Sequence, residues 1–90
     1  MLETHEIISY VAATCTTASF LPQAILTIKT KDTEGLSLGM YSLFAIGVFC
    51  WLIYGLQIED EAIIIANAIT LILAGIILSF KVYNTFIRKQ

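Results

Sequence analysis

Charged side chains are scarce in this sequence. Only 13% of its 90 residues are Asp, Glu, Lys or Arg, whereas a soluble globular domain carries roughly 25%. Hydrophobic residues make up 58% of the chain, and its mean hydropathy is +0.84. So few charges cannot cover the surface of a soluble domain of this length, and lipid must therefore solvate much of it. A chain this short is expected to form one domain, residues 1–90.

Basic clusters, metal-ligand patterns and catalytic groups are also lacking. The net charge of −2 offers no basic surface for nucleic acid. The single His5 and the two cysteines, Cys15 and Cys50, do not have the spacing of a metal site. We interpret the cysteines as small apolar filler, and a disulfide between them stays open because it depends on helix alignment. No nucleophile–base pair is present, so neither an enzyme nor a bound metal or cofactor is expected.

Three apolar runs are long enough to cross a bilayer, whose core of about 30 Å requires about 20 helical residues. They predict an all-α membrane protein with helices at about residues 7–28, 38–57 and 62–80. A polar loop, a very short acidic turn and a basic tail starting at Lys81 complete the chain. No Lys or Arg precedes the first run, which is therefore interpreted as a permanent helix rather than a secretory signal.

The charges predict how the chain is inserted. All basic residues lie in the first loop or the C-terminal tail, at Lys29, Lys31, Lys81, Arg88 and Lys89. The N-terminus and the second connection are acidic, with Glu3, Glu6, Glu59, Asp60 and Glu61. Because basic residues concentrate on the cytoplasmic side, we expect the N-terminus outside and the C-terminus in the cytoplasm.

Ionisable side chains are missing from the middle of every expected span. Such groups are costly in a membrane and usually mark proton relays or ion paths. Their absence argues against a proton-driven pump. It leaves passive movement of a neutral solute, or no transport at all.

A few polar residues inside the spans are candidates for function. Pro22 weakens the first helix and gives either a simple kink or a hinge, and the adjacent Gln23 amide needs a partner. Trp51 and Asn67 lie roughly 9 Å and 7.5 Å inside the outer ends of their helices, at 1.5 Å per residue. A sugar can stack its C–H face on an indole and bond a carboxamide through its hydroxyls. A helix–helix hydrogen bond explains Asn67 equally well.

Small residues predict how the helices pack. In the third run they recur every four residues, at Ala62, Ala66, Thr70 and Ala74. Such a stripe allows another helix to approach closely, and Gly75 and Ser79 extend a second small face. The third helix is therefore expected to lie between two neighbours, and the small polar residues at 12–19 are expected to line a cavity. Three helices cannot enclose a monosaccharide, so transport would require an assembly.

Several motifs occur in a distinctive order. They are Phe20-Leu21-Pro22-Gln23, the loop at residues 29–37, Met40-Tyr41, Trp51-Leu52-Ile53-Tyr54-Gly55 and Ala66-Asn67. Together they resemble the SemiSWEET family, bacterial three-helix sugar transporters of the PQ-loop group, over nearly the whole chain. The resemblance implies a third helix between the first two and a parallel homodimer. It also implies uniport of a mono- or disaccharide across the cytoplasmic membrane by alternating access.

The resemblance implies roles for two pairs of residues in the membrane. Trp51 and Asn67 match positions that contact the sugar. Pro22 and Gln23 match the Pro-Gln pair that acts as a hinge for alternating access.

The resemblance also implies two gates. Tyr54 and Asp60 match the outer gate, and Met40 and Tyr41 match the inner gate. Many relatives carry an Arg, able to pair with the gate Asp, where this chain has Ile58. Here either a hydrogen bond closes the outer gate, or the outward-open state is easier to reach.

Two other functions stay open on the sequence alone. One is transport of another small solute such as an amino acid, which some PQ-loop proteins carry. The other is a non-transporting membrane scaffold, which would have no use for Trp51 and Asn67 at one depth.

Overall fold

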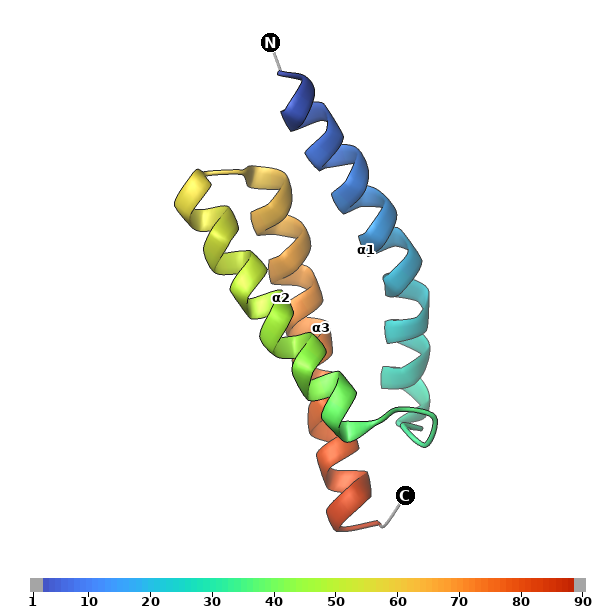
Figure 1. Ribbon diagram of the computed structural model, residues 1–90. Helices are drawn as coiled ribbons and strands as arrows, with labels where there is room; N and C mark the ends of the chain where they lie inside the picture. The colour runs from blue at the N-terminus through green and yellow to red at the C-terminus, as the bar shows by residue number, and fades with distance from the viewer. Residues whose placement is uncertain (1–2, 89–90) are drawn as a thin grey trace.

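Three long helices make up the protein (Figure 1), which a computed structural model describes from residue 3 to residue 88. Helix α1 spans Thr4–Thr30, α2 spans Leu38–Ile58 and α3 spans Glu61–Phe86. Each is long and apolar enough to cross a membrane, so the predicted all-α architecture with three spans is confirmed. We call the end with the α2–α3 turn and the start of α1 the turn end, and the opposite end the loop end (Figure 1).

Helices α1 and α3, the first and the last in the sequence, extend further than their apolar runs. Helix α1 begins at Thr4 because Glu3 and Glu6 form a capping box, in which each side chain bonds the other residue's backbone N–H. Helix α3 continues to Phe86 instead of ending near residue 80. The prediction that a basic tail starts at Lys81 is wrong, because Lys81 lies within α3 and is only 6% exposed.

Helix α3 lies between the other two helices, as the sequence predicted. It packs against both, whereas no Cα atom of α1 comes within 8 Å of one in α2 anywhere in residues 3–88. Ala62 and Ala74 of α3 are buried in these contacts. Gly55 of α2 approaches α3 so closely that an added Cβ would lie 2.7 Å from Cγ2 of Ile63.

Two side chains of α3 hold the α1–α2 loop. Nζ of Lys81 donates to the carbonyl oxygen of Thr33 at 3.1 Å. Nδ2 of Asn84 donates to Oγ1 of Thr33 at 2.8 Å and to the carbonyl oxygen of Lys31 at 2.9 Å. Thr33 is fully buried and Asn84 is 2% exposed, so the loop is part of the packed structure rather than a solvated connection.

Hydrogen bonds also join α1 to α3 at the turn end. Oγ of Ser9 donates to the two carboxylate oxygens of Asp60 at 2.9 and 3.1 Å. The hydroxyl of Tyr10 donates to Glu61 at 3.1 Å. Asp60 in addition caps α3, since its Oδ1 accepts the backbone N–H of Ile63 at 3.2 Å.

Helix α1 continues through Pro22 without a break. Proline lacks the backbone N–H that would bond the carbonyl of Ala18, so the helix is weakened at this turn. Figure 1 shows α1 curving along its length, as expected for a helix with an internal proline. The hydrogen-bonded ends of α1 thus flank a weaker middle.

Candidate functional site

Trp51, the candidate for stacking on a sugar, is open on one side. It is 56% exposed and meets the Tyr54 ring edge-on, with centroids 5.7 Å apart. A shallow groove here is lined by four residues of α2: Gly47, Cys50, Trp51 and Tyr54. Cys50, like Cys15, is a free thiol, so the disulfide that the sequence left open is not formed. A groove walled by one helix cannot enclose a ligand until another surface covers it.

Asn67, the candidate hydrogen-bonding partner, is half-buried on α3. Its Nδ2 donates to the carbonyl oxygen of Ile63, one turn earlier, at 2.9 Å. The amide therefore bonds its own helix rather than a neighbouring one. Asn67 does not line the groove at Trp51. One chain thus does not bring the two residues into a common pocket, and their joint sugar site stays a prediction.

Met40 and Tyr41, the candidate inner-gate residues, belong to an aromatic cluster at the loop end. Tyr41 and Phe44 have ring centroids 5.5 Å apart, and Phe44 lies 5.9 Å from Phe20 of α1. Met40 is 75% exposed. The groove at this cluster is completed by Gly35, Leu36 and Ser37. The cluster connects α1 to α2 by side chains, at a level where the backbones stay apart.

Gln23 of the candidate hinge and Tyr41 line one cavity of about 170 Å³. The other lining residues come from α1, the α1–α2 loop and α3: Phe20, Ala24, Thr27, Leu36 and Ile77. The hydroxyl of Tyr41 is buried and has no hydrogen-bond partner within the described chain. A candidate hinge residue and a candidate gate residue therefore line the same cavity.

Tyr54 and Asp60, the candidate outer-gate pair, are not bonded to each other in one chain. The Asp60 carboxylate is engaged by Ser9 and by the cap of α3, whereas Tyr54 is 48% exposed and packs on Trp51. Ile58 borders a hollow of about 510 Å³ at this end, together with His5, Glu6, Tyr10, Glu59, Asp60 and Glu61. None of these residues is Lys or Arg, so the lining offers Asp60 no arginine partner.

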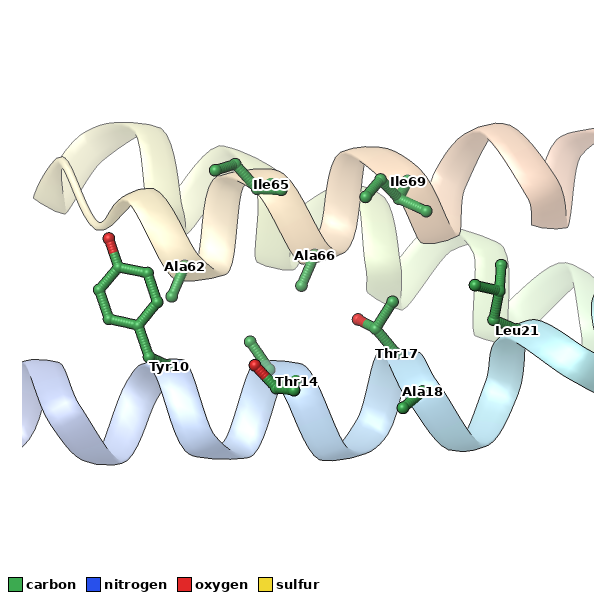
Figure 2. Close-up of a pocket in the computed structure, with 10 residues that line it drawn as sticks. Tyr10, Thr14, Thr17, Ala18, Leu21, Ala62, Ile65, Ala66 and Ile69 are labelled. Atoms are coloured by element: carbon green, nitrogen blue, oxygen red, sulfur yellow. The ribbon is translucent and has the colours of Figure 1, made fainter.

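A further groove, of about 330 Å³, runs between α1 and α3 in the half nearer the turn end (Figure 2). Figure 2 shows Tyr10 and Thr17 on α1 opposite Ala62 and Ala66 on α3. The remaining lining residues are Ala13, Thr14, Ala18, Leu21, Ile65 and Ile69. The small residues of the first helix thus line a hollow, as the sequence predicted.

Comparison with known proteins identifies the family. Residues 4–62 match the PQ loop repeat family. The sugar transporter SemiSWEET of Bradyrhizobium diazoefficiens is 45% identical over 76 residues, or 84% of this chain and 88% of that protein. The SemiSWEET of Leptospira biflexa is 46% identical over 77 residues, or 86% of this chain and 91% of that protein.

This chain belongs to the SemiSWEET family. Its structure is similar to the crystal structure of a SemiSWEET in the inward-open conformation, with a TM-score of 0.85 and 42% sequence identity. That similarity covers 98% of this chain and all of the other. SemiSWEET membership places the chain among transporters and not enzymes, as the sequence predicted.

Sequence reasoning missed the hydrogen bonds that hold this SemiSWEET-family fold at its two ends. Lys81 and Asn84 carried a local signal, since residues three apart share one face of a helix. Their partner Thr33 did not, because it lies far away in the sequence. The contact of Ser9 with Asp60 is likewise set by how α1 packs on α3 and has no local pattern.

Proposed function

We propose that the protein moves a neutral mono- or disaccharide down its concentration gradient across the bacterial cytoplasmic membrane. The observation that carries this proposal is the identity of 45% and 46%, over more than four-fifths of the chain, with proteins that are named sugar transporters. Residues 10–28, 38–57 and 62–80 contain no Asp, Glu, Lys, Arg or His. Because coupled transport of protons or ions normally needs such groups in the membrane, uniport is the favoured mechanism.

The proposed transporter is a parallel homodimer. One chain measures 51 × 23 × 15 Å along its principal axes, and a single helix with its side chains is already about 10–12 Å across. A slab this thin has no room for an enclosed sugar. A second copy facing the groove at Trp51 would supply the missing wall and bring a second Asn67 to the same path.

The proposed roles follow the family motifs. Trp51 stacks on the sugar, and the carboxamide of Asn67 bonds its hydroxyls. Pro22 and Gln23 form the hinge that lets α1 bend between the two access states. These assignments are supported by the exposure of Trp51 and by the weakened turn at Pro22.

The proposed gates lie at the two ends of the path. Tyr54 and Asp60 close the turn end, and Met40 and Tyr41 close the loop end. Exposure supports this assignment, because the side chains of Tyr54 and Met40 are both exposed and a second copy can contact them.

The turn end is proposed to face outward. It carries the acidic residues Glu6, Glu59 and Glu61, whereas the loop end carries Lys29, Lys31, Lys81 and Arg88. This segregation supports a cytoplasmic loop end by the positive-inside rule.

Uptake by proteoliposomes containing the purified protein tests the function. Radiolabelled mono- and disaccharides are compared with amino acids, with and without a proton ionophore. We expect uptake of at least one sugar. This uptake should stop when the concentrations inside and outside the vesicles are equal, and the ionophore should not change it. Trp51→Ala should abolish most of it, since millimolar binding represents only about 4 kcal/mol and an aromatic contact about 0.5–1.5 kcal/mol of that. Uptake of amino acids alone, or accumulation driven by a pH gradient, would disprove the proposal.

A further inference from the structure

The cavity beside the hinge contains an unsatisfied polar group. The Tyr41 hydroxyl is buried there and has no partner in residues 3–88. Buried polar atoms in proteins nearly always have a hydrogen-bond partner, so this exception requires an explanation. Tyr41 also lines the cavity of about 170 Å³, so its side chain borders space into which a neighbouring polar group can move.

Gln23 is the group best suited to pair with this hydroxyl. It lines the same cavity from the opposite helix, and its carboxamide offers one acceptor oxygen and two N–H donors. The side-chain hydrogen bonds of the neighbouring turns belong to Ser19 and Thr30, and none engages Gln23. Since the backbones of α1 and α2 stay apart at this level, no backbone contact prevents the two helices from approaching.

We propose that Gln23 and Tyr41 form a hydrogen bond when this cavity closes, and that the pair couples bending of α1 at Pro22 to the position of the first turn of α2. The inference rests on the alternating access proposed above. In the conformation described here the cavity is open and the hydroxyl is unpaired. The bond stabilises only the closed-cavity conformation, so it sets how the population divides between the two states.

Two near-isosteric variants test this coupling. Tyr41→Phe removes the hydroxyl, and Gln23→Met removes the carboxamide while keeping the length of the side chain. Both are made singly and together in a background with Cys15→Ser and Cys50→Ser, in which Met40→Cys supplies one thiol at the loop end. The rate of maleimide modification in detergent, relative to the denatured protein, reports the open-to-closed ratio without any sugar.

Each single variant is expected to raise the open-to-closed ratio by roughly 2- to 10-fold, as one net hydrogen bond allows. The double variant should exceed neither single one, because both remove the same bond. Thr27→Val is the matched control: it removes another hydroxyl from the same cavity and should leave the ratio unchanged.

Three results would overturn the inference. Effects of Tyr41→Phe and Gln23→Met that multiply in the double variant would show that the two residues act independently. An effect of Tyr41→Phe alone would assign the hydroxyl to water or to a second copy of the chain, and no effect of either would leave the pair without a role. Sugar uptake by the unsubstituted protein is measured separately, so failure of the proposed function is distinguishable from failure of the coupling.

Discussion

Replacing Gly55 by alanine tests the contact that fixes α2 against α3. The added Cβ would lie 2.7 Å from Cγ2 of Ile63 and 3.2 Å from the backbone nitrogen of Ile64. Because the second atom belongs to the backbone of α3, rotation of a side chain cannot relieve the whole overlap. Overpacking of this kind typically costs about 1–3 kcal/mol, whereas alanine gains about 0.5–1 kcal/mol over glycine inside a helix.

Gly75→Ala provides the matched control. Gly75 also lies inside a helix, but an added Cβ there has no atom within 4 Å. The gain in helix propensity is common to both variants and cancels in their difference. We therefore expect Gly55→Ala to be less stable than Gly75→Ala by about 1–3 kcal/mol, which is the packing cost alone.

The same contact bears on the candidate site. Gly55 lies one turn after Trp51, and Ile63 lies one turn before Asn67 and accepts its amide N–H. Pushing the helices apart at this point changes the level of the indole relative to the carboxamide. Sugar uptake by folded Gly55→Ala protein should therefore fall below that of Gly75→Ala.

Both comparisons use standard measurements. Helical circular dichroism during titration with sodium dodecyl sulfate gives the unfolding midpoint, and proteoliposome uptake gives the activity. If Gly55→Ala is as stable as Gly75→Ala and equally active, the close approach of α2 and α3 at this glycine is wrong.

Three further changes test other parts of the structure. Pro22→Ala should keep equilibrium sugar binding but lower flux, and parallel loss of both would assign the proline a purely structural role. Asn84→Leu removes two hydrogen bonds to the loop and should lower stability by about 1–3 kcal/mol in the same detergent titration; an unchanged midpoint would contradict the anchoring of the loop. A reporter fused to the C-terminus should read cytoplasmic and a tag at the N-terminus external, and a cytoplasmic N-terminus would refute the orientation.

The three spans and the central place of α3 were predictable because their signals are local. Hydropathy over about 20 residues identifies a span without knowledge of its partners. The stripe that includes Ala62 and Ala74 marks a helix face built for close approach, and both residues are buried in the structure. A pattern repeated along one helix can be recognised without knowing how the other helices pack against it.

The hydrogen bonds at the two ends of the helix bundle were not predictable, because the residues that they join lie far apart in the sequence. Lys81 begins a basic segment of the kind found in cytoplasmic tails, yet its ammonium donates to a carbonyl oxygen 48 residues earlier in the chain. The spacing of Lys81 and Asn84 places both on one face of a helix, but it does not show that the loop at Thr33 covers that face. The proposed joint site of Trp51 and Asn67 is harder still to predict, since one chain leaves the two residues in separate surroundings.

The geometry of Asp60 bears on how the outer gate closes without an arginine. A carboxylate offers about four acceptor sites, and two donors already contact it: the single hydroxyl of Ser9 and the backbone N–H of Ile63. About two acceptor sites are left, which is enough for a hydroxyl donor. Ile58 stands where many relatives carry the arginine, and the hydroxyl of Tyr54 in a second copy could donate to one of the remaining sites. The in-chain contacts of Asp60 are therefore compatible with the proposed closure of the outer gate by hydrogen bonding.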